Sequence, residues 1–444
     1  MSNDMYLLSV SVTGIKNIEK EVSLQFYKKG VDKDFDPTKY RIKAIYGENG
    51  AGKSAIITAV DIFGNILFDD SYLANPENQR FLDALINKKT KSFRFECETL
   101  FASDTENKIF RYCIEIKKNL SDRFEITHEK MEVKSGNYVN NNYKDVFIAN
   151  NGVVDYVLGT GELKDKMISL STNLLKYQTF ISIFIHNLNL VNDLKLIDGK
   201  DLLISCLSFM LLSFKVKVYL GEEDRHELYF AKKRLYENLT SDESSEIIEQ
   251  YNRIIKGYIS VNETIVLQKN FEKYKKKVDR LCRFIKLFKQ DLINIEIDKT
   301  EDGKYYRCEL VLDYGEYKIA REFESTGIKK LIRLYDSLDF ATDSGIVFID
   351  EMDSNINDVY LCKLIEFFMY YGKGQLCFTT HNIDPMSVLQ ENKKSIVFLS
   401  NDNVIIPWTS NGNNTPEKCY KNGLIKKLPF NIDPADFIGI LGVE

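Results

Sequence analysis

The octapeptide Gly47-Glu48-Asn49-Gly50-Ala51-Gly52-Lys53-Ser54 decides how the rest of this sequence is interpreted. It fits the pattern G-x-x-x-x-G-K-[ST] at every fixed position, between the apolar run IKAIY (42–46) and a helical stretch that begins at Lys53. Glycines in such a loop let backbone N–H groups wrap phosphates, and the helix N-terminus adds partial positive charge. Lys53 is then placed to reach the β- and γ-phosphate oxygens, and Ser54 offers its hydroxyl to Mg²⁺. The octapeptide predicts a site for a nucleoside triphosphate with Mg²⁺.

Two apolar strands downstream end in residues suited to phosphate chemistry. The run IVFI (346–349) is followed by Asp350 and Glu351, and the run QLCF (375–378) by Thr379, Thr380 and His381. A parallel strand delivers Asp350 to the metal shell at its carboxyl end, where Glu351 can polarise the attacking water. The imidazole of His381 can hydrogen-bond a γ-phosphate or orient that water. An acid pair at a strand end is common, and it gains meaning here from the phosphate loop upstream.

A third element is the Ser-x-Gly turn at Ser325 and Gly327, directly before a predicted helix. It is a second candidate anion site because a helix N-terminus presents free N–H groups, and an ordinary N-cap is the alternative. The turn is informative because of the order of motifs along the chain. The phosphate loop comes first, followed by a long insertion, the Ser-x-Gly turn before a helix, the apolar strand that ends in Asp-Glu, and the strand that ends in His.

With this order of motifs the chain resembles the ABC-type ATPases of the SMC/RecF branch, and among them the OLD-like ATPases of bacterial anti-phage defence. The resemblance rests on SVTGIKNIEKEVSLQF, IYGENGAGKS, FRYCIEI, ESTGIKKLIRL, VFIDEMDSNIN and FTTHN. The ATPase components of PARIS-type and Septu-type systems look nearest. The resemblance implies ATP and Mg²⁺ as ligands. The residues that it implies bind ATP are Gly47 to Ser54, Lys16, Asn17, the signature residues Ser325 and Gly327, and Asp353 of a D-loop at Asp353-Ser354. It implies that Ser54 and Asp350 hold the metal and that Lys53, Glu351 and the switch residue His381 act in catalysis.

The same resemblance implies partners. In such ATPases ATP is held between two heads, with the signature of one head on the γ-phosphate bound by the other, so a homo-oligomer is expected. The segment after His381 holds no second cluster of acids for a two-metal nuclease site, so a separate effector, a nuclease or toxin, is expected together with a phage-derived trigger. Two features depart from the family: the signature reads ESTGIKK, and Gln79 is only a guess for the Q-loop.

The predicted fold class is α/β, an ABC-type P-loop ATPase head with a mixed sheet, an antiparallel β-subdomain and a helical insertion. Residues 1–150 form the N-terminal lobe, 151–291 the insertion, 292–400 the C-terminal lobe with signature, acid pair and His381, and 401–444 a tail with no assigned task. The insertion is too short for the long coiled-coil arms of SMC proteins.

The distribution of charge bears on which partners and functions the sequence allows. The 444 residues carry a net charge of −5, which predicts no partner, but the segment Lys269–Lys289 has nine basic residues against Glu272 and Asp279. A solvated helix face and a DNA-backbone contact are its two interpretations. The second supports the alternative function, a RecF/SMC-like DNA repair or maintenance ATPase, and a scaffold that binds ATP without turnover is a third reading.

Cellular location follows from targeting and cysteine patterns. The eight cysteines form no C-x-x-C pair and are expected to be reduced. The N-terminus lacks the basic segment of a secretory signal, and the longest apolar run, 202–214, is shorter than the ~20 residues that span a bilayer. We expect that run to be a buried helix, no membrane association, and a cytoplasmic protein.

Overall fold

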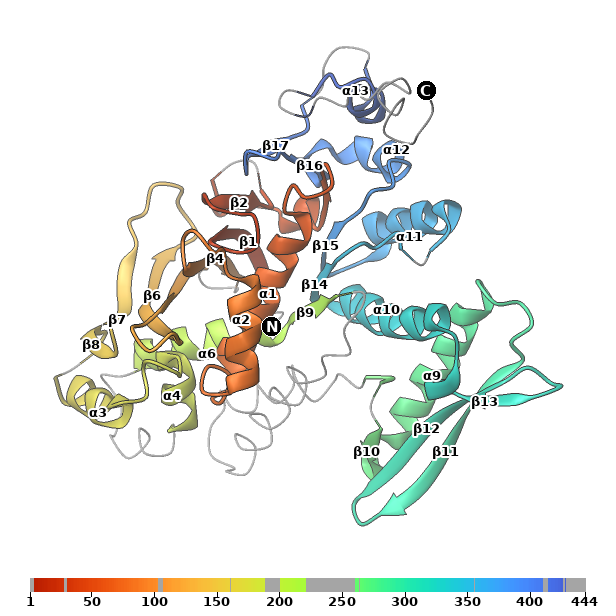
Figure 1. The fold of residues 1–444 in the computed structure, drawn as a ribbon, viewed down its shortest axis with the longest axis horizontal. Coiled ribbons are helices and arrows are strands. Elements are labelled where there is room, and N and C mark those ends of the chain that lie inside the picture. The colour runs from red at the N-terminus through yellow and green to blue at the C-terminus, as the bar shows by residue number, and fades with distance from the viewer. Residues whose placement is uncertain are drawn as a thin grey trace, which may run out of the picture.

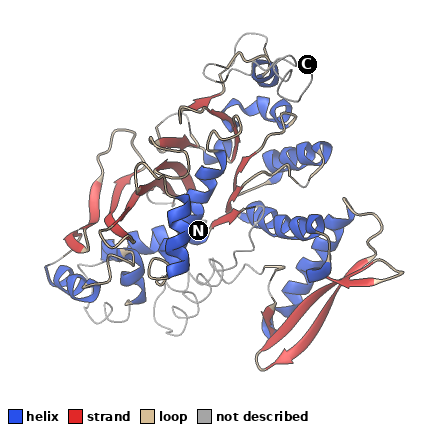
Figure 2. Ribbon diagram, viewed as in Figure 1, coloured by secondary structure: helices blue, strands red, loops and turns tan. Residues whose placement is uncertain are grey.

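Three β-sheets and the helices between them make this a mixed α/β protein (Figures 1 and 2). The computed structural model describes residues 4–27, 30–102, 107–159, 161–187, 200–220, 260–262, 264–354, 356–409, 414–425 and 428. The two larger sheets face each other across one core, and the smallest sheet lies with helix α9 (Phe271–Lys286) at the other side of the molecule (Figure 1). The predicted combination of a mixed sheet with an antiparallel sheet is confirmed.

The mixed sheet has six strands in the order β17-β16-β3-β15-β14-β9. Their bounds are Ile405–Pro407, Ile396–Leu399, Ile42–Tyr46, Gln375–Thr379, Ile346–Ile349 and Val216–Tyr219. All neighbours are parallel except β17, which pairs antiparallel to β16. Every residue of the four strands β16, β3, β15 and β14 is buried, as expected for a parallel sheet covered on both faces.

Alternate residues of this sheet enter two different cores. Ile45 faces the core shared with helix α1 (Lys53–Phe68) and the antiparallel sheet. Ala44 and Tyr46 face the core shared with α9 (Phe271–Lys286), α10 (Thr326–Asp343) and α11 (Asp358–Tyr371). The period of two along a strand thus places one layer of structure on each side of the mixed sheet.

The antiparallel sheet has seven strands in the order β2-β1-β4-β5-β6-β7-β8. Their bounds are Val22–Gln25, Asp4–Thr13, Ser92–Ala102, Lys108–Lys118, Phe124–Ser135, Lys144–Asn150 and Val153–Val157. The side chain of Gln375 joins this sheet to β15, since it accepts from the N–H of Leu7 at 2.7 Å and donates to its carbonyl at 2.9 Å. The predicted boundary at residue 150 falls inside the β7–β8 hairpin, so the N-terminal sheet extends to Val157.

The segment predicted as a helical insertion, 151–291, is only partly helical. It contains α3 (Gly161–Ser171), α4 (Phe180–His186), α6 (Lys200–Phe214) and α9, and the run 202–214 is indeed a helix, α6. It also supplies β9, which pairs with β14 and so belongs to the mixed sheet. Residues 188–199 and 221–259 of the insertion lie outside the described residues. Within the described ranges, no helix has the length and apolar character needed to cross a bilayer.

The smallest sheet has the order β10-β12-β11, with β13 also paired to β12. Its strands are Ile265–Leu267, Tyr305–Asp313, Asn294–Asp302 and Lys318–Ala320. A turn through Asp313 and Gly315 joins β12 to β13, and Gly315 takes a φ of +84° that favours glycine. The chain then enters α10. After β17 the tail contains α13 (Pro416–Lys421), and residues 429–444 of the predicted tail lie outside the described residues.

Candidate functional site

Three neighbouring parallel strands end at one edge of the mixed sheet. Ile45 of β3 lies opposite Thr379 of β15, and Phe378 of β15 lies opposite Ile349 of β14. Residues that follow these strands therefore emerge side by side, at the edge where ligands bind in open α/β sheets. The structure brings together there the phosphate loop, the acid pair and the strand-end histidine that the sequence singled out.

The phosphate loop is held from both sides. Gly50 and Gly52 have φ values of +83° and +105°, in the region that favours glycine, and Gly52 is the N-cap of α1. A Cβ atom on Gly47 would lie 2.4 Å from the carbonyl oxygen of Leu399, so β16 approaches the loop too closely for any other residue. Asn49 and Gly50 are exposed, whereas Ala51 is buried. The tip of the loop, at Asn49 and Gly50, is therefore exposed, while the rest of the loop is held in place by close packing.

Lys53 occupies the interior of the loop. Its Nζ donates to the carbonyl oxygens of Gly47 at 2.8 Å and Glu48 at 3.0 Å, and the residue is buried. Burial lowers the pKa of Lys53, and the charges of Asp350, Glu351 and Asp353 act in the opposite direction. The ammonium thus faces the three acids across the sheet edge and is available to a phosphate once it leaves the two carbonyls.

Thr379 holds the acid pair in place. Its hydroxyl donates to Asp350 Oδ1 at 2.6 Å and accepts from the N–H of Glu351 at 2.8 Å. Glu351 has a φ of +48°, and the N–H of the next residue, Met352, donates to the Thr379 carbonyl at 3.0 Å. These bonds fix a strained turn that directs the exposed Glu351 side chain away from the core. The sequence placed Thr379 before His381 but gave it no role.

Asp353 continues the acidic edge. Its Oδ2 accepts from the backbone N–H groups of His381 and Asn382, each at 3.2 Å. Its Oδ1 is buried and has no hydrogen-bond partner among the described residues. The predicted D-loop is therefore tied to the predicted switch residue through the backbone, while the side chain of His381 is exposed.

Lys16 and Asn17 lie on the loop at its glycines. The Asn17 amide donates to the carbonyl of Gly50, and its Oδ1 lies 3.1 Å from where a Cβ of Gly52 would be. Lys16 has a φ of +48°, and its backbone bonds to Leu85 and Asn87. Asn17 therefore stabilises the loop, and the side chain of Lys16 is exposed beside it.

Ser325 and Gly327 lie elsewhere. Ser325 is the N-cap of α10, with its hydroxyl accepting from Ile328 N–H at 3.3 Å, and a Cβ on Gly327 would meet nothing within 4 Å. Figure 1 shows α10 running from the β11–β13 sheet toward β14, so its first turn lies at the far end from the mixed sheet. In the described part of the chain, no hydrogen bond or ion pair joins either residue to the phosphate loop. One chain thus does not bring the Ser-x-Gly turn to its own loop.

Gln79, the guess for the Q-loop, is occupied by structural bonds. Its amide donates to the carbonyls of Leu73 and Phe124 and accepts from the N–H of Phe124 at 2.7 Å. It joins helix α2 (Pro76–Leu85) to β6, so the structure gives it no access to the site.

The C-terminal segment contributes contacts that sequence reasoning missed. The Tyr420 hydroxyl accepts from the N–H of Gly47, its ring stacks on Phe398 at 5.5 Å, and burial raises its pKa to about 12. Asn401 donates to the Glu48 carboxylate. No motif marks these positions, because their role depends on β16 lying next to β3.

The donor set suits Mg²⁺ only together with phosphates. No cluster of three or more His, Cys, Asp or Glu side chains that could hold a metal ion occurs among the residues the structure describes. Mg²⁺ commonly binds through one or two protein oxygens plus substrate phosphates and water, which Ser54 and Asp350 fit.

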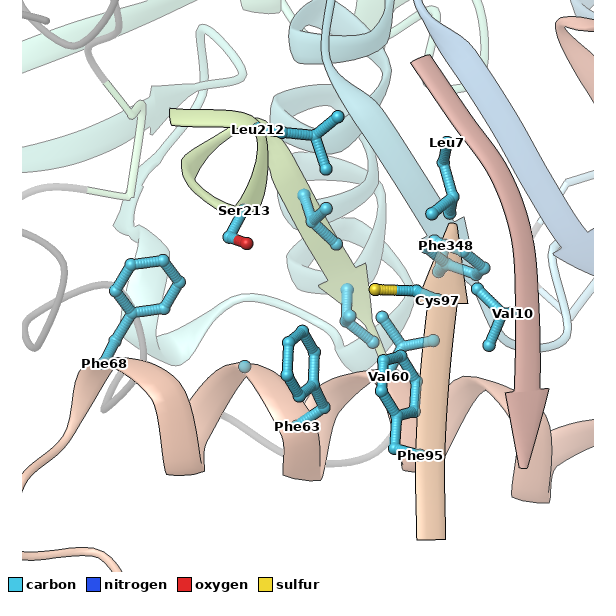
Figure 3. Close-up of a pocket in the computed structure, with 13 residues that line it drawn as sticks. Leu7, Val10, Val60, Phe63, Phe68, Phe95, Cys97, Leu212, Ser213 and Phe348 are labelled. Carbon is cyan, nitrogen blue, oxygen red and sulfur yellow. The ribbon is translucent and has the colours of Figure 1, made fainter. Parts of the chain in front are cut away.

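A cavity elsewhere in the molecule is too small to be an alternative ligand site. Figure 3 shows that its lining comes from α1, α6 and the strands β1, β4, β9 and β14. The cavity has a volume of about 30 Å³. Its lining is apolar apart from Ser213, whose hydroxyl bonds to the Phe209 carbonyl at 2.9 Å. A space that small holds about one water molecule, so it belongs to core packing.

Comparisons with known proteins add little to this geometry. No protein-family model matches the chain, and no curated protein matches it. Among solved structures, the chain is similar to one titled "Structure of the recombination mediator protein RecF-ATPrS in RecFOR pathway", at 12% identity and a TM-score of 0.37. That similarity covers 92% of this chain and 100% of the other.

Proposed function

We propose that the chain binds ATP with Mg²⁺ at the edge of the mixed sheet and hydrolyses it to ADP and phosphate. The observation that carries this proposal is that the phosphate loop and the acid pair meet at one sheet edge. There the negative charges of Asp350, Glu351 and Asp353 act on the pKa of buried Lys53 and raise it. Loop and acids are about 300 residues apart in sequence, and they follow strands β3 and β14, which lie on either side of β15 in the sheet. A phosphate loop combined with a carboxylate pair at one strand edge is the arrangement that triphosphate hydrolysis needs.

Each residue has a chemical task in this proposal. The Lys53 ammonium leaves the carbonyls of Gly47 and Glu48 and binds the β- and γ-phosphate oxygens. The Ser54 hydroxyl and Asp350 hold the metal, which when bound neutralises charge on the phosphates. Glu351 orients the attacking water and accepts its proton, and the exposed imidazole of His381 contacts the γ-phosphate.

We further propose that two heads pair around the nucleotide. The support is the position of Ser325 and Gly327 on an open helix end with free space around Gly327. In a single chain, the site is open to solvent at the exposed tip of the phosphate loop. A second head that supplied its Ser-x-Gly turn would complete the site. Hydrolysis by an isolated chain is then slow and rises with protein concentration.

The biological role we propose is that of a sensor subunit in anti-phage defence, which controls a separate nuclease or toxin when a phage-derived trigger appears. Its support is the resemblance in motif order to OLD-like ATPases. Purification together with the product of the neighbouring gene, and mass measurement with and without ATP, tests it. Absence of any stoichiometric effector in cells expressing both genes would remove this role and leave the ATPase proposal intact.

The ATPase proposal is tested with two variants. Lys53→Ala is expected to lose ATP binding, whereas Glu351→Gln keeps ATP bound and loses hydrolysis. ATP affinity and phosphate release are measured for both variants and for wild type, with Lys166→Ala, a lysine of α3 outside the site, as the control. Equal hydrolysis by Glu351→Gln and wild type would contradict the role of that carboxylate.

A second candidate is a DNA repair or maintenance ATPase. The observation in its favour is the exposed basic row on and beside α9, which comprises Lys269, Lys273, Lys275, Lys276, Arg280, Arg283 and Lys286. Lys277 is not part of that row, because it is buried against Asp336 at 3.0 Å and Asp339 at 3.1 Å. DNA binding that weakens steeply with salt and stimulates hydrolysis would favour this candidate.

A further inference from the structure

One face of helix α11 carries an apolar stripe that is exposed to solvent. Val359, Tyr360, Phe367, Tyr370 and Tyr371 are 69%, 40%, 42%, 59% and 71% exposed. At 3.6 residues per turn these five side chains and Lys363 fall within a sector of roughly 120°. A surface helix normally turns polar residues outward, whereas α11 is apolar on both faces, because its core side carries the buried residues Leu361, Ile365 and Phe368. We call the six residues of the exposed sector the α11 stripe.

The α11 stripe is large and held rigidly from below. An aromatic side chain presents about 150–250 Å² when free, so residues that are about half exposed leave on the order of 500 Å² uncovered. Tyr360 packs on Phe288 at 5.0 Å, Phe367 packs on Tyr371 at 5.6 Å, and the Tyr370 hydroxyl bonds to Glu391 at 3.2 Å. A patch of this size on fixed aromatic rings is typical of an interaction surface.

The charges at the α11 stripe are self-complementary. Near the middle of the helix, Lys363 of the stripe and Glu366 at the edge of the stripe form an ion pair, 2.7 Å apart at Nζ and Oε2. If two copies of α11 pack antiparallel about a two-fold axis through the helix centre, Lys363 of one copy meets Glu366 of the other. Antiparallel helix dipoles add to this match.

We propose that the α11 stripe binds a second copy of this chain through antiparallel α11–α11 pairing. An isologous interface requires a surface complementary to itself, which the charge pattern satisfies. Two copies would bury about 1,000 Å² in total, which is at the lower end for specific interfaces and gives a weak, concentration-dependent dimer. This interface does not depend on nucleotide or on the proposed function. Where heads also pair around ATP, the two interfaces together build assemblies of more than two chains.

The test is sedimentation of the full chain without nucleotide over a concentration series from about 1 to 100 μM, the range where weak dimers of this size dissociate. Every protein carries Lys53→Ala, so that nucleotide-dependent pairing does not contribute. Lys363→Glu and Glu366→Lys each set like charges against each other across the axis and are expected to raise the dimer dissociation constant about tenfold. The double exchange Lys363→Glu with Glu366→Lys restores opposite charges and returns the constant to within about threefold of the parent.

Two more variants complete the test. Phe367→Glu places a charge among the aromatic rings and is expected to abolish the dimer, whereas Lys286→Glu, on the exposed face of α9, leaves it unchanged. Equal melting temperatures show that each variant is folded. A chain that stays monomeric at the highest concentration overturns the proposal, and so does a dimer in which the single and double charge exchanges behave alike.

Discussion

Removing the Thr379 hydroxyl tests how the acid pair is held. Thr379→Val keeps the shape of this buried residue and deletes the group that donates to Asp350 at 2.6 Å and accepts from Glu351 N–H at 2.8 Å. A hydrogen bond to a charged group contributes about 1.5–3 kcal/mol, and an orphaned N–H costs about 1–3 kcal/mol. The same bonds hold Glu351 at a φ of +48°, a conformation that costs about 1–2 kcal/mol for a residue with a Cβ.

We therefore expect Thr379→Val to destabilise this turn by about 3 kcal/mol and to release Glu351 from its strained position. A displacement of about 1 Å at a reacting group can lower a rate by about 10²-fold, so kcat for ATP is expected to fall far more than ATP affinity. Hydrolysis at saturating ATP, ATP affinity and the melting temperature are the measurements.

Thr379→Ser is the matched control. It keeps the hydroxyl and loses one methyl group, which costs about 0.8 kcal/mol. Wild-type kcat is expected for the serine variant, with a small fall in melting temperature. If the valine and serine variants had the same kcat and the same melting temperature, the hydroxyl would not position the acid pair and the reasoning would be refuted.

Three further predictions concern stability. Burial raises the pKa of Glu129 to about 7, so the folded protein keeps a proton that the unfolded chain releases near pH 4.5. The protonated side chain therefore contributes about 3 kcal/mol to the free energy of unfolding below pH 4.5, and this contribution is lost as the pH rises to 7. Glu129→Gln should remove that part of the pH dependence of the melting temperature. Gln375→Leu leaves both backbone groups of Leu7 without a partner and should destabilise the protein by about 2–4 kcal/mol in thermal unfolding. Asp336→Asn removes the charge that faces Lys217 and Lys277, and a loss of about 3–5 kcal/mol is expected, whereas unchanged melting would show that the pairs contribute nothing.

Local signals predicted the strands and helices that frame the site. The octapeptide at 47–54 lies between β3 and α1, and the apolar runs before Asp350 and Thr379 are β14 and β15. Each signal combines a short pattern with a neighbouring element, so no distant contact is needed to identify it. The catalytic and binding roles assigned to these residues stay predictions until they are tested by substitution.

Three features that depend on distant contacts were not predicted. Strand β9 has four residues and is stabilised by pairing with β14, about 130 positions later, so the sequence around it looked like helical insertion. The role of Thr379 follows from the β14–β15 register, and that of Tyr420 from the position of β16. The burial of Lys277 was visible in principle, because it lies within the apolar spacing of Tyr274, Val278 and Leu281.

The strand order of the mixed sheet also bears on how the protein is made. β3 is synthesised early, yet both of its neighbours, β15 and β16, come from residues 375–399. During translation its two edges have no partner until most of the chain has left the ribosome, whereas the antiparallel sheet is complete by Val157. We expect that sheet to fold first on the nascent chain and the edge that bears the loop and the acids to assemble last.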